Sequence, residues 1–438
     1  MKQKISFSQI VANGCVSFCS DADCLKEFYL VSKKGISDEF KAKKEKFKYA
    51  FLISEKLDTL FKIEREKRDS AINDILEFEI CSGKKIGDVI DSIDIAENNN
   101  IVYSLNYSIK NIEKFDANVA KSAKNEANYL LKTAKSSTLS NAIVIFEQFL
   151  SYVYSALIYE HKDKYFENKN IQIKNLLDKS IDEILDEEIS KIVECDMYDS
   201  FLLLNKIFEK EKISSNYAIN VLNEFKEAYF RRNMYIHNDG YVNQQYLNKI
   251  ENTKYQLNDY LKCDDNYLKK LIVVLKELIV FVSISLINKI DPNQNAYSDI
   301  LDYCFETLKK EEYDFCEFVY RYNAQNKYLD NTHKMVSQAN LLICLKETKQ
   351  KDKFDEEINL FDVTGSDSDF LIAKKILEEK FEEATNLILD NYEVGTTSRK
   401  ILSWPLFKNY RETEFFKKLT EMKSDDFNSV EILDSGNQ

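Results

Sequence analysis

The scarcity of glycine and proline is the strongest constraint on the fold, since 438 residues contain only 8 Gly and 2 Pro. The turns of β-rich folds and the loops that hold phosphate groups both depend on glycine. The shortage therefore favours long helices. Three glycine-based motifs, GxxxxGK[ST], GxGxxG and GxSxG, are also absent from the sequence. Nucleotide-binding and hydrolase folds that carry these motifs are therefore not indicated.

The composition is that of a globular protein, with 44% hydrophobic and 31% charged residues, and the length suggests two or three domains. The chain starts without the apolar core of a signal peptide, and its nine cysteines are scattered. The longest uncharged apolar run, 278–287, is too short to span a bilayer. We therefore expect reduced thiols, a cytoplasmic location and no membrane segment.

The net charge of −13 bears on nucleic-acid binding. Proteins that coat nucleic acid non-specifically usually carry a basic face, because their affinity comes from neutralising phosphates. The charge argues against broad, tight RNA binding but leaves room for a small local basic site.

The sequence predicts an all-α protein in three regions. Residues 1–115 form an N-terminal region of unknown role that is mostly helical, and β-branched runs at 76–80 and 101–105 could add short strands. Residues 116–290 carry the clearest helical periodicity. A linker around Pro292 leads to a third region, 291–438, which resembles helical repeats.

Four helices are predicted within 116–290 from apolar residues that recur every three or four positions. They are expected at 141–160, at 186–209, from Leu222 through the segment Arg232–His237, and at 267–287. The triplet Asn238-Asp239-Gly240 should end the third helix, because these residues tolerate a left-handed backbone. The fourth helix is apolar on nearly all sides and should be buried.

In the third region, 371–384 resembles a tetratricopeptide helix hairpin in which Ala384 allows close helix approach. Residues 341–358 have a similar outline, with Phe354 in the place of Phe381. This offset is 27 residues, whereas tetratricopeptide repeats recur every ~34 residues. Degenerate repeats and an ordinary helical bundle are both compatible with this pattern.

Only three histidines are available for acid–base chemistry. His161, at a helix end, and His333, in a polar turn, are expected to be surface residues. His237 differs because Asn233 lies four residues before it, about 40° away on a helix, so the amide could orient the imidazole. Arg232 lies about 140° from His237 and in step with the apolar residues Leu222, Phe225, Tyr229 and Ile236.

An arginine within an apolar stripe needs a carboxylate or a phosphate as a partner. Glu147 occupies a similar position among the apolar residues of 141–160, and we expect it to pair with Arg232 or Arg231. Imidazole can transfer a proton near neutral pH and a guanidinium can stabilise charge on a phosphate, which suits RNA cleavage. The structural alternative is a helix-terminal histidine packed against an Arg–Glu bridge.

No metal or cofactor site is indicated. Ligand-type residues do not cluster around His237, which implies a metal-independent route. Cys15, Cys19 and Cys24 are close in sequence, but their spacing matches no paired CxxC site and no histidine lies nearby. We expect ordinary thiols there.

The segment from Arg232 to His237 resembles the Arg-x4-6-His motif of the HEPN superfamily, including the polar Asn233 directly after the arginine. The continuation Asn238-Asp239-Gly240 and the order of the four helices resemble bacterial HEPN proteins over roughly 150 of the 438 residues. The resemblance implies a HEPN helical bundle in which Arg232 and His237 are catalytic. Asn233 would support them, and Glu147 and Arg231 would lie beside the motif.

The same resemblance implies a metal-independent endoribonuclease that forms a homodimer with a composite site and leaves a 2′,3′-cyclic phosphate and a 5′-hydroxyl end. Such an enzyme would cleave tRNA or mRNA as a toxin or an anti-phage effector. Some HEPN domains are inactive, so the alternative is a dimerising adaptor that binds a protein partner through 291–438. A partner of a separate nucleotidyltransferase antitoxin is less attractive, because such HEPN proteins are usually much shorter.

Overall fold

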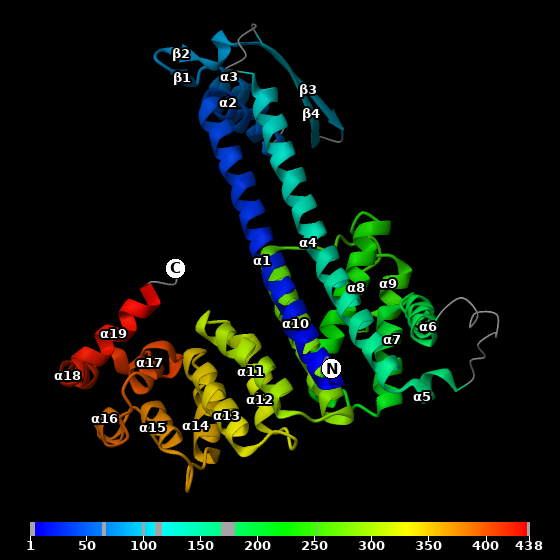
Figure 1. The fold of residues 1–438 in the computed structure, drawn as a ribbon. Coiled ribbons are helices and arrows are strands. Elements are labelled where there is room, and N and C mark those ends of the chain that lie inside the picture. The colour runs from blue at the N-terminus through cyan, green and yellow to red at the C-terminus, as the bar shows by residue number, and fades with distance from the viewer. Residues whose placement is uncertain are drawn as a thin grey trace. The chain divides into compact units, whose positions relative to one another are not determined.

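The computed structural model describes residues 5–63, 67–98, 101–109, 116–167, 180–251 and 253–435. Helices dominate these residues, and the strands among them form two antiparallel two-stranded sheets, which confirms the predicted all-α class (Figure 1). The chain divides into two compact units. The first contains the chain up to Asp23, Asn141–Lys262 and the residues from Lys269 onward. The second contains Cys24–Ser140 and Cys263–Leu268.

The long helices α1 (Phe7–Lys46) and α4 (Ala117–Glu160) contribute to both units. The units therefore follow neither the expected boundary at 115/116 nor that at 290/291, and the three-region division stays a prediction. Within the second unit the two helices run antiparallel, and Lys43 of α1 pairs with Glu126 of α4 at 2.8 Å. Asp265 joins their other ends by accepting hydrogen bonds from Tyr29 and Lys33 and pairing with Lys135.

The rest of the second unit lies between these helices in the sequence. It comprises α2 (Lys48–Asp58), η1 (Thr59–Lys62), α3 (Arg68–Leu76), β1 (Glu79–Cys81), β2 (Lys84–Lys85), η3 (Ile86–Asp88), β3 (Ile90–Asn98) and β4 (Ile101–Ile109). The strand predicted at 101–105 is confirmed within β4. The strand predicted at 76–80 was placed too early, because Leu76 still belongs to α3 and β1 begins at Glu79.

In the first unit, the C-terminal part of α4 covers the helix predicted at 141–160, and the other helices of the central region follow it. They are α5 (Lys162–Phe166), α6 (Ile181–Asp196), α7 (Ser200–Glu211), η6 (Asn216–Ala218), α8 (Ile219–His237), α9 (Gln244–Lys249) and α10 (Asp265–Ile290), whose first residues belong to the second unit. The single helix expected at 186–209 is wrong. Asp199 interrupts it, because its carboxylate accepts hydrogen bonds from the backbone N–H groups of Phe201 and Leu202 and so starts a new helix.

Helix α10 is the central core helix of the first unit, as its apolar sequence predicted. Its side chains from Leu278 to Ile287 are almost entirely buried. By length and composition alone, α4 and α10 are apolar enough to cross a membrane. In α10, however, 83% of the most apolar stretch of 18 residues is buried inside the structure. Core helices of soluble proteins meet the same criteria, so the absence of a membrane segment stays a prediction.

The C-terminal part of the first unit consists of short helices in sequence-adjacent pairs. They are α11 (Gln294–Lys309), α12 (Tyr313–Ala324), α13 (Asn331–Glu347), α14 (Lys351–Leu360), α15 (Ser368–Leu377), α16 (Phe381–Asp390), α17 (Thr396–Ser403), η7 (Pro405–Phe407), η8 (Tyr410–Glu412), α18 (Glu414–Met422) and α19 (Ser424–Ser435). The helix hairpin predicted at 371–384 is present as α15 and α16, and Ala384 is fully buried, as expected.

One turn geometry recurs in three of these hairpins. Glu311, Lys349 and Glu379 each adopt a positive φ of 59–61° between the paired helices. In each turn the backbone N–H of the next residue donates to the carbonyl five residues before it, the pattern of a Schellman motif. Lys349 and Glu379 are 30 residues apart. Phe354 therefore corresponds to Ala384 and not to Phe381, which corrects the predicted 27-residue offset.

A buried ion-pair network connects the N-terminal helix, the core helix and the C-terminal hairpins. The side chain of Lys276 in α10 is fully buried, and its Nζ lies 2.7 Å from Asp23 of α1 and 2.9 Å from Glu312, which caps α12. Tyr303 of α11 donates a hydrogen bond of 2.7 Å to Asp23. Three parts of the chain that are distant in sequence thus share one buried cation.

The next residue, Glu277, has no such compensation. Burial raises the pKa of its carboxyl to about 8, and the nearby carboxylates of Glu224 in α8 and of Asp314 and Glu317 in α12 act in the same direction. The positive charge of Lys270, about two turns before Glu277 in α10, lowers this pKa but does not cancel the rise. The folded protein therefore binds a proton at Glu277 more tightly than the unfolded chain does.

Because this pKa is raised on folding, the stability contributed by protonated Glu277 is present below pH 4.5 and is lost as the pH rises towards 8. Glu277→Gln should leave the melting temperature unchanged at pH 5 and raise it by roughly 2–5 °C at pH 9. Thermal unfolding at both pH values measures this, with the exposed Glu356→Gln as control. An equal effect of Glu277→Gln at both pH values would contradict the assignment.

Candidate functional site

The ion pair between Glu147 and Arg232 is the centre of the predicted site. Glu147 lies in the apolar face of α4 and Arg232 lies in α8, and Arg232 Nη2 donates to Glu147 Oε1 at 2.9 Å. Both side chains are largely buried, with 18% of the arginine and 27% of the glutamate exposed. Of the two pairings that the sequence left open, the structure contains the one with Arg232.

The pair lies in a partly dehydrated environment formed by α7 and α8. The guanidinium of Arg232 lies over the ring of Tyr229, 5.4 Å from its centroid. Ser200, the first residue of α7, is buried beside Glu147 and Tyr229. Burial raises the pKa of the Glu147 carboxyl, and the positive charge of Arg232 and the hydroxyl of Ser200 only partly oppose the rise.

The guanidinium of Arg232 is not saturated by these contacts. Among the residues that the structure describes, the arginine bonds Glu147 through Nη2 alone, and neither Nη1 nor the buried Nε makes a hydrogen bond. A guanidinium has five N–H donors in a fixed plane. Glu147 therefore fixes the orientation of the arginine and leaves donors for an anionic group.

Arg231 has a different, structural role. It is 4% exposed, and it donates to Glu227 at 2.8 Å and to the carbonyl oxygen of Lys262. Tyr246 of α9 donates to the same Glu227 carboxylate at 2.6 Å. Arg231 thus anchors the segment that follows α8, including α9, to the helix that carries the motif, and it does not contact Glu147.

His237 is the last residue of α8 and is exposed, whereas Asn233 is half-buried. Within the described ranges, no hydrogen bond joins His237 to Asn233 or to Arg232, so the expected support of the imidazole by Asn233 is not present. Ile236 is 53% exposed and does not belong to the apolar stripe in which the sequence placed it. The structure brings Glu147 and Arg232 together, while His237 faces solvent at the helix end.

The predicted helix stop is confirmed. The backbone N–H groups of Asn238 and Gly240 both donate to the carbonyl of Met234, at 2.8 and 3.0 Å, and close the last turn of α8. Asp239 and Gly240 have φ values of 51° and 85°. A Cβ atom on Gly240 would lie 2.9 Å from the ring of Tyr260. Only glycine fits this turn without displacing that ring.

The other two histidines have acidic neighbours. His161 is not simply a solvated cap: its Nδ1 is buried and lies 3.6 Å from Glu211 Oε2. His333 is in the first turn of α13, and its Nδ1 lies 2.8 Å from Asp330, the N-cap of that helix. Cys15 and Cys19 are buried, Cys24 is exposed, and the described residues contain no group of three His, Cys, Asp or Glu side chains placed to bind a metal.

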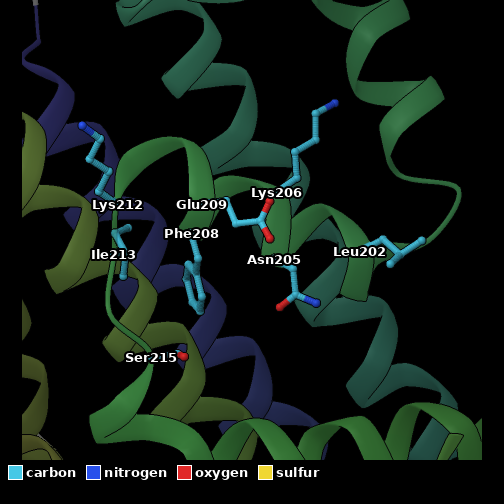
Figure 2. A pocket seen from close by; sticks show the side chains of 8 residues that line it. All are labelled: Leu202, Asn205, Lys206, Phe208, Glu209, Lys212, Ile213 and Ser215. Carbon is cyan, nitrogen blue, oxygen red and sulfur yellow. The ribbon is translucent and has the colours of Figure 1, made fainter.

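A surface cavity of about 630 Å³ lies along the C-terminal half of α7 (Figure 2). It is lined by Leu202, Asn205, Lys206, Phe208, Glu209, Lys212, Ile213 and Ser215. None of the residues predicted for the site lines it. Lys206 is already paired with Asp196 at 2.5 Å, and the second lysine of the lining, Lys212, shares the cavity with the carboxylate of Glu209. The Glu147–Arg232 pair is the better candidate, because its guanidinium is fixed and keeps free donors.

No protein-family model matches the chain, and neither does any curated protein or solved structure.

The sequence did not single out Ser200 or Tyr246, and it treated Tyr229 only as a packing residue. Ser200 lay inside what was expected to be a continuous helix. The Asp199-Ser200 pair, residue types that favour helix starts, was the available signal. Tyr246 lies 19 residues from Glu227, and no local pattern indicates that contact.

Adjacent arginines with different partners allow a matched test. Arg231→Met should lower the free energy of unfolding by about 3 kcal/mol, because it removes a buried guanidinium together with its bonds to Glu227 and to the Lys262 carbonyl. Arg232→Met should cost less, about 1 kcal/mol, since Arg232 is 18% exposed against 5% for Arg231 and only its bond to Glu147 is lost. Urea unfolding of both variants measures the difference. A larger loss for Arg232→Met would show that the roles are reversed.

The turn at Gly240 gives a second prediction. Gly240→Ala should destabilise the protein by about 2 kcal/mol or more, because alanine is strained at positive φ and its Cβ would meet Tyr260. Gly365 is a matched control, with φ of 71° and no neighbouring atom within 4 Å of the place that a Cβ would take. Gly365→Ala should cost about 1 kcal/mol. Equal losses in urea unfolding would exclude any contribution from the tyrosine contact.

Proposed function

We propose that this chain is a metal-independent endoribonuclease of the HEPN type, acting as a toxin or an anti-phage effector on tRNA or mRNA. The main support is the side-chain arrangement on α8: Arg232 is fixed by Glu147 with free donors, and the exposed His237 ends the same helix. The sequence resemblance to the Arg-x4-6-His motif supplies the reaction type.

In the proposed reaction the ribose O2′ attacks the adjacent phosphorus, and the P–O5′ bond breaks. The proton leaves the 2′-hydroxyl, a second proton reaches O5′, and the products carry a 2′,3′-cyclic phosphate and a 5′-hydroxyl. His237 performs one of these proton transfers as general base or acid. Arg232 stabilises the additional negative charge on the phosphate oxygens.

A homodimer would complete this site. Arg232 and His237 leave α8 about 140° apart, and no hydrogen bond joins them among the described residues. In a dimer, the His237 of one copy could act on a phosphate held by Arg232 of the other, and two imidazoles would supply the base and the acid. The proposal thus has RNA as the substrate and a second copy of the chain as the partner. It also keeps the cytoplasmic location expected from the sequence.

The repeated helix hairpins favour one alternative function, a catalytically silent adaptor. Three hairpins with the same turn lie in the C-terminal part of the first unit, and stacked helix pairs often present protein-binding surfaces. In that case the HEPN-like bundle would dimerise and residues 291–438 would bind a protein partner.

The deciding experiment is cleavage of total RNA and of a tRNA pool by the purified full-length protein in excess EDTA. Wild-type protein should cleave, and its products should carry cyclic phosphate ends. His237→Ala and Arg232→Ala should each lower the rate roughly 100-fold or more. His333→Ala, which removes an imidazole far from the motif in sequence, should retain the wild-type rate.

The outcomes separate the two functions. Cleavage that persists in both motif variants would place the active site elsewhere. A folded wild-type protein that cleaves neither RNA pool, and whose expression does not slow growth, would favour the adaptor.

A further inference from the structure

An exposed tyrosine, Tyr241, follows the candidate acid–base residue His237 by four residues. Tyr241 is 47% exposed, although Val242 and Tyr246, which follow it, are fully buried. Two hydrogen bonds keep it close to the end of α8. The N–H of Tyr241 donates to the carbonyl of Asn238 at 2.9 Å, and the side-chain amide of Asn238 donates to the carbonyl of Tyr241 at 2.6 Å.

The backbone of Tyr241 is held rigidly from the other side. Residues 240–242 pair with 259–261 as a short antiparallel bridge, with bonds of 2.9 Å from Val242 N to Asp259 O and from Leu261 N to Gly240 O. This pairing is tied to α8 because Tyr235, inside the motif, donates to the carbonyl of Leu261 at 2.6 Å. An exposed side chain on such a fixed backbone is ordered at little entropic cost when a ligand binds.

The ring of Tyr241 is supported but not covered. Tyr260 meets it in a T-shaped contact, with ring centroids 5.3 Å apart and planes at 66°, and Tyr235 meets Tyr260 in the same way at 6.1 Å. No other ring in the described part of the chain contacts Tyr241. One edge-to-face neighbour leaves a face of the ring available, and the adjacent Ile236 is 53% exposed.

We infer that Tyr241 is a stacking platform for an unpaired nucleobase next to the scissile phosphate, so that the substrate is single-stranded RNA. This rests on the proposed function. Base–aromatic stacking tolerates any base and suits an exposed, rigid ring. Attack by O2′ also needs the O2′, phosphorus and O5′ atoms in line, which stacked duplex RNA resists. A base held by Tyr241, beside His237, would keep its nucleotide out of such a helix.

The test measures binding without cleavage. The probe is a single-stranded oligonucleotide, 2′-O-methylated throughout so that it has no attacking hydroxyl, with 2-aminopurine as a fluorescent base. Full-length wild-type protein should bind it and quench the fluorescence. Tyr241→Ala and Tyr241→Leu should raise Kd about tenfold and lose the quenching, whereas Tyr241→Phe should behave like wild type. Tyr129→Ala, an exposed tyrosine of α4, is the matched control.

Equal Kd values for wild type, Tyr241→Ala and Tyr241→Leu would overturn the inference, and so would equal binding of the same strand annealed to its complement. Loss of a dimer in Tyr241→Ala, measured by light scattering, would also overturn it, because this surface would then be a contact between copies. The proposed function is tested separately with cleavable RNA. A protein that binds the probe through Tyr241 but never cleaves RNA would refute the nuclease while supporting the stacking site.

Discussion

The first unit depends on one buried cation. Lys276 is fully enclosed, and its charge is balanced by Asp23 from the N-terminal helix and by Glu312, which lies in the turn between α11 and α12. Two carboxylates hold the pKa of this lysine above its usual value despite burial. Loss of Lys276 would leave both carboxylates without their cation, which costs several kcal/mol. The N-terminal helix and the C-terminal hairpins are therefore integral to the bundle that carries the motif.

This arrangement explains why the motif helix has a defined environment. Helix α10 fills the interior, and α4, α7 and α8 provide the residues around Arg232. The cap at Asp199 is essential to this, because it ends the preceding helical path and starts α7 with Ser200 buried beside Glu147. A continuous helix through 197–199 would place those side chains on a different face. A local capping preference thus determines the electrostatics of a tertiary site.

Patterns between residues close in sequence predicted the helices and the end of the motif helix. The apolar periodicity predicted helices corresponding to α8 and α10, and Asn238-Asp239-Gly240 predicted where α8 ends. The Glu147–Arg232 pair could be predicted because both charged residues stand within apolar stripes. Lys276 could not, since a single lysine in an apolar run does not reveal partners 253 and 36 residues away. The hairpin register was also misjudged, because phenylalanine positions were compared where the shared feature is the left-handed turn residue.

The two adjacent arginines have different roles: Arg231 stabilises the fold, and Arg232 belongs to the candidate site. On a helix, neighbouring residues point about 100° apart, so Arg231 and Arg232 necessarily face different surroundings. Arg231 faces the segment after α8 and donates hydrogen bonds to Glu227 and to the Lys262 carbonyl. Arg232 faces α4 and retains unused donors. The Lys262 carbonyl that Arg231 bonds directly follows the short pairing of Tyr241 with Tyr260. Arg231 therefore helps to position these two tyrosines after the end of α8, while Arg232 remains available to an anion.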